Sequence, residues 1–223
     1  MSAAPNATRP RVSWKVATSL DGRIALADGT SQWITGPEAR ARGHQMRAQH
    51  DAIMVGIGTV LADDPLLTAR TVPLPPVQPV RIIADSRART PVNGRLMASA
   101  GLGRIIIATE TAETGPLREA GAELWPCKRA AAGGIDLEYF LHRCVIEGIN
   151  SLFVEGGGHL AASFIRAGLI DEICWFRAPK LIGGDGLPAL ASIGLTEMAN
   201  TPNWSITATE RIGDDILETY VRR

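Results

Sequence analysis

Three consecutive glycines between an apolar segment and a helix-like segment constrain this chain more than any other feature. Residues 151–154 have the composition of a strand, Glu155 follows, and the glycines at 156–158 lead into residues 160–166, which have the pattern of a helix. Glycines let backbone N–H groups approach an anion closely, and the N-terminus of a helix favours negative charge. The stretch therefore predicts a phosphate-binding turn or, alternatively, a tight strand-to-helix turn without a ligand.

Strand and helix patterns alternate through the middle of the chain, which predicts an α/β fold with a mostly parallel sheet covered on both faces. Predicted strands cover residues 12–19, 51–57, 80–84, 104–109, 123–125, 151–154 and 172–178, and predicted helices cover 37–49, 117–120, 137–147 and 160–166. A C-terminal antiparallel hairpin is expected over 206–221. Residues 24–27 are expected to pair back as a short extension of the first strand. We expect a disordered lead, 1–11, and a single domain, 12–223.

The composition narrows the classes of partner. Among the 223 residues, 23 Lys plus Arg balance 23 Asp plus Glu, so no basic excess favours nucleic acid. No apolar run is long enough to span a bilayer and no signal sequence is visible, so no membrane partner is expected. Three cysteines without CxxC spacing favour reduced thiols and a cytoplasmic location. Four histidines without HxE or HxxxH pairing give no metal site.

Turns suited to ligands follow three of the predicted strands, at residues 56–59, 85–87 and 155–158. The carboxyl ends of parallel strands lie at one edge of a sheet, where open α/β sheets bind their ligands. The two glycine turns are suited to a pyrophosphate, and Ser86 and Arg87 offer a hydroxyl group and a guanidinium for a further phosphate. An arginine in place of an acidic residue favours NADP over NAD, although an ordinary surface arginine is the alternative for Arg87.

Several polar or aromatic residues outside these turns have two interpretations each. Lys15 lies within a strand, so it faces solvent at a sheet edge or points into a polar site. The pair Asp63–Asp64 either reaches a site at the short helix or merely ends that helix. Arg47 and Arg70 are suited to a substrate phosphate, or they are surface charges. Trp33 stacks on a planar ring or caps the core.

These residues lie in motifs that resemble the reductase half of the bacterial bifunctional riboflavin-biosynthesis deaminase–reductase. The motifs occur in family order from about residue 12 to the C-terminus, and they cover residues 19–25, 31–35, 47–53, 58–70, 154–158, 171–172 and 178–184. The resemblance implies a dihydrofolate-reductase-like three-layer fold, NADPH as the hydride donor, and a homodimer.

The resemblance also implies a reaction, which is reduction of the ribosyl group of 5-amino-6-(5-phosphoribosylamino)uracil to ribityl. The residues implied for the cofactor are Ala17, Trp33, Thr59, Asp63, Ser86 and the turn that contains Gly157, Gly158, His159, Leu160, Ala161, Ala162 and Ser163. Those implied for the substrate are Ser31, Arg47, Leu67, Arg70 and Glu155. Lys15 and Asp63 are our candidates for the proton transfers.

One departure from the family pattern affects the expected substrate. The chain lacks the HxE and PCxxC motifs of the zinc deaminase, so we expect a stand-alone reductase or an excised domain, with a separate deaminase as a partner. Two alternatives follow for the substrate, which are the non-deaminated diaminopyrimidinone and a pterin or dihydrofolate. A third alternative is an NADP-binding regulatory domain without activity.

Overall fold

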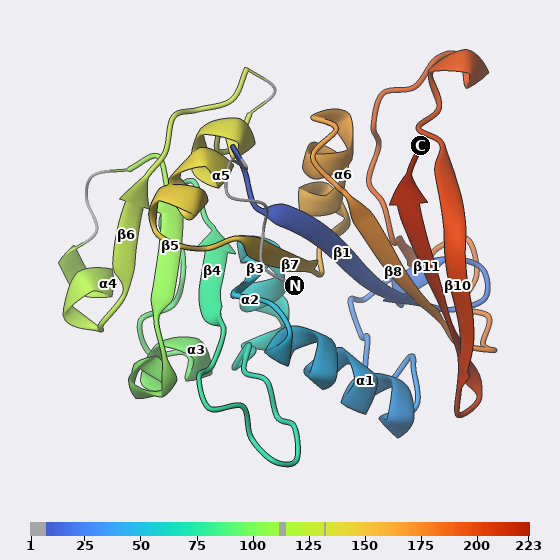
Figure 1. Cartoon of the computed structure of the whole chain (residues 1–223), viewed down its shortest axis with the longest axis horizontal. Helices are drawn as coiled ribbons and strands as arrows, with labels where there is room; N and C mark the ends of the chain where they lie inside the picture. The colour runs from blue at the N-terminus through green and yellow to red at the C-terminus, as the bar shows by residue number, and fades with distance from the viewer. Residues whose placement is uncertain (1–7, 112–114, 132) are drawn as a thin grey trace. The chain divides into compact units, whose positions relative to one another are not determined.

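The computed structural model describes residues 8–111, 115–131 and 133–223, which form two compact units (Figure 1). The first unit contains the described residues up to Arg11 and residues 44–153, and the second contains residues 12–43 and 154–223. Most of the predicted lead lies outside the described residues, and the prediction of a single domain over 12–223 stays a prediction. Each unit is described by itself.

The first unit is built on four parallel strands that lie side by side in Figure 1. They are β3 (Ala52–Gly56), β4 (Val80–Ala84), β5 (Ile105–Thr109) and β6 (Glu123–Pro126), and they pair in that order. Continuous apolar runs such as Ala52 to Val55 form these strands because both faces of a parallel sheet are buried.

Helices supply the cover on each face of these strands. The helices of this unit are α2 (Ile57–Asp63), α3 (Arg95–Ala98), η1 (Ala100–Leu102), α4 (Gly115–Glu119) and α5 (Leu137–Ile146). Leu124 of β6 belongs to a buried cluster with residues of α2, α3 and α4. Its neighbour Trp125 points to the opposite face, where its ring lies 5.9 Å from that of Phe140 on α5. The alternation along β6 therefore gives the sheet two buried faces.

The second unit combines parallel and antiparallel pairing. Its strand β1 (Arg11–Thr18) pairs parallel with β8 (Glu172–Arg177), which pairs antiparallel with β11 (Asp215–Arg222), and β10 (Trp204–Ile212) completes the C-terminal hairpin. The helix α6 (Gly158–Arg166) and the short η2 (Met198–Asn200) also belong to this unit. Three elements cross the unit boundary, which are β1, α1 (Pro37–Ala48) and β7 (Ser151–Glu155). The predicted α/β class, with a mostly parallel sheet and a C-terminal hairpin, is confirmed.

The expectation that residues 24–27 extend the first strand is wrong. The segment forms β2 (Arg23–Ala25), which pairs with β9 (Leu187–Pro188) as a separate two-stranded sheet. The turn before β2 is held by the carboxylate of Asp21, which accepts hydrogen bonds from Ser19 Oγ (2.6 Å), Gly183 N (2.7 Å) and Ile182 N (3.1 Å). Two family motifs far apart in the sequence are thus joined by one side chain. The Ser19 hydroxyl and these backbone N–H groups lower the pKa of Asp21 to about 2.

No helix among the described residues is long and apolar enough to cross a membrane.

Candidate active site

The glycine turn joins β7 to α6. Gly156 and Gly157 adopt positive φ angles of 66° and 72°, a conformation that side chains with a Cβ rarely adopt. Gly157 is the residue that precedes the first turn of α6, where backbone N–H groups have no partner within the helix. Glu155, immediately before the turn, is buried at 7% exposure. The predicted order of a strand, a glycine turn and a helix N-terminus is therefore present.

Gly158 has a packing role that the sequence did not reveal, and its predicted part in binding the cofactor stays a prediction. A Cβ atom built on Gly158 would lie 3.1 Å from Ala191 N, 3.1 Å from Pro188 O and 3.2 Å from Ala189 O. Ala191 N also donates a hydrogen bond of 3.1 Å to Gly158 O. This glycine lets α6 pack closely against the chain's own segment 188–191, which is a structural requirement independent of any anion.

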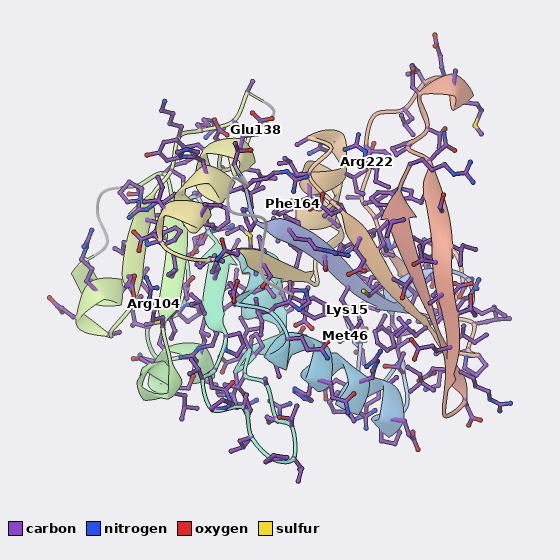
Figure 2. The ribbon with its side chains drawn as sticks, viewed as in Figure 1. Lys15, Met46, Arg104, Glu138, Phe164 and Arg222 are labelled. Carbon is purple, nitrogen blue, oxygen red and sulfur yellow. The ribbon has the colours of Figure 1, made fainter. Side chains whose placement is uncertain are left out.

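The helix that follows offers few side chains to a ligand. Ala161 and Ala162 are buried in the core, as is Phe164, which is labelled in Figure 2. Ser163 Oγ donates to the backbone oxygen of His159 (3.1 Å) and accepts from Arg166 Nη2 (3.2 Å). The exposed side chain of His159 and the backbone of the first turn are the parts of α6 best placed for an anion.

Lys15 and Ala17 lie on the same face of β1, because side chains alternate along a strand. Lys15 is half-buried, its Nζ lies 5.4 Å from the centre of the Phe176 ring, and it is labelled in Figure 2. A Cβ on Gly43 of α1 would lie 4.0 Å from Lys15 Cε. The lysine is thus packed between a ring and a helix, which favours the polar-site interpretation over a fully solvated edge position.

Trp33 is exposed over 62% of its surface, so the interpretation that it caps the core is wrong. The guanidinium of Arg40 lies 4.4 Å from the ring centre, and Lys180 Nζ donates to the Trp33 backbone oxygen at 2.8 Å. Ser31 lies in the same loop and is half-buried. A ring that lies against one guanidinium, in a loop fixed by Lys180, and that is open to solvent is suited to stacking on a planar group.

In the first unit, α2 carries Thr59 and Asp63 four residues apart, so both lie on one face of the helix. Asp63 is at the surface, yet partial desolvation raises the pKa of its carboxyl group. Its neighbour Asp64 ends the helix with a positive φ of 40°, and its Oδ1 accepts a hydrogen bond from Arg95 N at 2.7 Å. Asp64 therefore ends the helix, as one of the two interpretations expected, and a role for Asp63 in a site at this helix stays a prediction.

Two of the predicted phosphate-binding residues lie on neighbouring segments of the first unit. Arg47, in the last turn of α1, donates to Thr68 O at 3.0 Å. Arg70 is exposed, and its backbone N–H donates to His44 Nδ1 at 3.3 Å. Desolvation lowers the pKa of the Arg70 guanidinium, and the charges of Arg47 and Arg95 lower it further. This concentration of positive charge is suited to a phosphate.

The sequence interpretation missed Arg95 and His44, because no local pattern connects either residue to Arg70. Leu67 also differs from the other predicted substrate residues, since its side chain is buried in the core cluster at 2% exposure and its backbone has a positive φ of 54°. Ser86 and Arg87 follow β4 in a loop described below.

Each unit thus gathers its own part of the predicted set. The first unit holds Arg47, Thr59, Asp63, Leu67, Arg70, Ser86 and Arg87. The second holds Lys15, Ala17, Ser31, Trp33, Glu155 and Gly157 to Ser163. A hollow of about 320 Å³ in the second unit, lined in part by Trp175, Trp204 and Tyr220, contains none of them. Among the described residues, no group of three or more His, Cys, Asp or Glu side chains could hold a metal ion.

Comparison with known proteins identifies the family. Residues 10–217 match the model of the RibD C-terminal domain. The chain belongs to the RibD C-terminal domain family. It is 39% identical over 218 residues to riboflavin biosynthesis protein RibD from Actinobacillus pleuropneumoniae, covering 96% of this chain and 57% of that protein. The chain therefore spans little more than half the length of that relative.

A second relative in this family is matched over almost its whole length. It is the 2,5-diamino-6-ribosylamino-4(3H)-pyrimidinone 5′-phosphate reductase from Methanothermobacter thermautotrophicus. The two sequences are 38% identical, and the match covers 95% of this chain and 98% of that relative. Among solved structures, RibD from Acinetobacter baumannii aligns with a TM-score of 0.84 at 27% identity, covering 97% of this chain and 58% of that one. The resemblance stated from the sequence motifs is confirmed.

Proposed function

We propose that this RibD-family chain is a pyrimidine reductase of riboflavin biosynthesis that uses NADPH to reduce the ribosyl group of 5-amino-6-(5-phosphoribosylamino)uracil to ribityl. The observation that carries the proposal is the match to a named pyrimidine reductase over 98% of that relative's length. That relative is a reductase by name, and the part of the RibD proteins that this chain matches is their C-terminal domain.

The residues of the second unit fit a dinucleotide. The positive φ angles of Gly156 and Gly157 expose the backbone at the start of a nine-residue helix, a favourable place for a pyrophosphate. The open ring of Trp33 is suited to stacking on a planar ring of the cofactor. When bound, NADPH supplies a hydride to C1′ of the substrate's ribose.

Protons must also move in this reaction. Opening the ribose ring transfers a proton from the amine nitrogen to the departing ring oxygen and leaves a neutral C=N bond between that nitrogen and C1′. Addition of the hydride to C1′ then places an electron pair on the nitrogen, which takes up one proton, so the reaction consumes one hydride and one proton overall. We assign these proton transfers to Lys15 and Asp63. The raised pKa of Asp63 lets its carboxyl group hold a proton at a higher pH than an ordinary aspartate.

The first unit supplies the groups that bind the substrate phosphate. Arg47 and Arg70 are placed for this role, with Arg95 adding to the positive field. Glu155 and Ser31 are assigned to polar groups of the substrate. Leu67 sits in the core, so its backbone is the part that we assign to substrate contact.

A direct test is to follow NADPH absorbance with the purified chain and each of the two pyrimidines. Oxidation of NADPH with the deaminated pyrimidine supports the proposal. The diaminopyrimidinone is the second candidate, since the relative from Methanothermobacter thermautotrophicus is named for that substrate. Turnover of dihydrofolate or a pterin alone would reassign the substrate, and NADPH binding without any turnover would leave a regulatory NADP-binding domain.

The oligomeric state, the partner and the location belong to the same proposal. We expect a homodimer, which light scattering of the purified chain measures. We expect a separate deaminase to supply the deaminated substrate, which a coupled assay with that enzyme tests. A cytoplasmic location is supported by the three cysteines, which are all free thiols.

A further inference from the structure

The loop that follows β4 is held rigidly at both ends. At its start, Asp85 N donates to Ala108 O at 2.9 Å, and Ser86 O accepts from Glu110 N at 3.1 Å and from Thr109 Oγ1 at 3.3 Å. In its middle, Ala88 N donates to Asp85 O at 3.0 Å. The loop therefore has little freedom to adapt to whatever binds against it.

The other end of this loop is held by hydrogen bonds between two buried residues, Asp85 and Thr90. Asp85 is completely buried, and its Oδ2 accepts two hydrogen bonds of 2.8 Å from Thr90, one from the backbone N–H and one from Oγ1. Its Oδ1 lies 3.8 Å from Arg89 Nε and has no hydrogen-bond partner among the described residues. Burying a carboxylate is costly unless it is bonded, so these contacts fix the side chain in place.

The direction of the Asp85 carboxylate bears on cofactor choice. An acidic residue near the end of a strand can bind the ribose 2′-hydroxyl of NAD and would repel the 2′-phosphate of NADP. Asp85 stands at such a position, but its carboxylate is turned into the protein towards Thr90. The side chains left on the outside are the hydroxyl group of half-buried Ser86 and the exposed guanidinium groups of Arg87 and Arg89.

We propose that Asp85 and Thr90 form a positioning pair that sets the preference for a 2′-phosphate. Thr90 keeps the carboxylate of Asp85 inside the loop, and Asp85 in turn holds Arg89 beside Arg87. The phosphate then meets one hydroxyl and two guanidinium groups instead of an acid. This inference rests on the proposed use of NADPH and adds two residues, Thr90 and Arg89, for which the sequence patterns assigned no role.

The test uses two fragments of the cofactors, adenosine 2′,5′-bisphosphate and adenosine 5′-monophosphate, whose affinities are measured by calorimetry. Thr90→Val removes the hydroxyl donor and keeps the shape, whereas Thr90→Ser keeps the donor. We expect Thr90→Val to weaken binding of the bisphosphate about five- to tenfold, the size expected when charge-assisted hydrogen bonds lose their alignment. Binding of the monophosphate should stay unchanged, and Thr90→Ser should retain the wild-type preference.

A second variant covers the case in which Thr90→Val does not fold. The side chain of Arg89 is half exposed, so Arg89→Gln should fold normally and should lower affinity for the bisphosphate alone. A folded Thr90→Val or Arg89→Gln protein with the wild-type preference would overturn the inference and leave the NADPH proposal standing. A wild-type chain that binds both nucleotides equally would overturn the NADPH proposal, and the inference with it.

Discussion

Gly158 begins α6, and a single methyl group added there should destabilise the protein. The Cβ of Gly158→Ala would lie 3.1–3.2 Å from three backbone atoms of the segment 188–191. Backbone atoms cannot swing aside as a flexible side chain can. The helix and this segment would therefore have to separate by a few tenths of an ångström, and the hydrogen bond from Ala191 N to Gly158 O would be disturbed.

Two effects of opposite sign decide the size of this change. Alanine favours a helix over glycine by up to about 1 kcal/mol. Overpacking a tight site costs roughly 1–3 kcal/mol. The packing effect is the larger because the obstructing atoms are backbone, so we expect a net loss of about 1 kcal/mol in the free energy of unfolding. For a chain of this length, that corresponds to a fall of roughly 2–4 °C in Tm.

The matched control is Gly58→Ala in α2. A Cβ on Gly58 would meet nothing within 4 Å, so only the helix preference remains and this variant should gain up to about 1 kcal/mol. Urea unfolding followed by circular dichroism measures both variants against the wild type. If Gly158→Ala is stabilised as much as Gly58→Ala, close packing against residues 188–191 is not what requires glycine, and the argument fails.

Three further predictions concern charge and thiol reactivity. The folded-state pKa of Asp21 is about 2 against an ordinary 3.8, so the ionised carboxylate stabilises the fold above pH 3.8 and this stabilisation is lost as the pH falls towards 2. Asp21→Asn should therefore show a smaller fall in Tm between these pH values than the wild type in a series of melting curves. Arg70→Ala should raise the substrate KM at least about tenfold with kcat less affected, and an unchanged KM would remove Arg70 from phosphate binding. Burial raises the pKa of Cys127 to about 11 and of Cys144 to about 12, so both thiols should react with a disulfide reagent far more slowly in the native protein than in urea.

Local patterns in the sequence predicted most of the elements that frame the site. The mostly apolar run from Val80 to Ala84 marked β4 with the observed bounds, and Pro37 and Glu38 marked the beginning of α1. The glycines after β7 correctly indicated a strand-to-helix turn, because positive φ angles at Gly156 and Gly157 are a local requirement. Such features depend on neighbours within a few residues.

What the sequence did not reveal depends on contacts between distant segments. The need for glycine at 158 comes from residues 188–191, which lie about thirty positions further along the chain. From the sequence alone, Asp85 could equally have been a solvated acid at the end of a strand. Its burial and its hydrogen bonds to Thr90 became visible only in the structure. The exposure of Trp33 likewise follows from where Arg40 and Lys180 hold its loop. Tertiary packing, which spacing alone does not encode, determined each of these outcomes.

The acceptor for the start of α1 is provided from the far end of the chain. Gly36 N donates a hydrogen bond of 2.7 Å to Oδ2 of the buried Asp215, which lies 179 residues later at the tip of the C-terminal hairpin. During synthesis, residues 44–153 leave the ribosome before the C-terminal hairpin does, and they include the buried residues of the first unit. Residues 12–43 can complete the second unit only after the last strands have been synthesised. We therefore expect nascent chains stalled before Asp215 to show protease resistance in the first unit and none in the second.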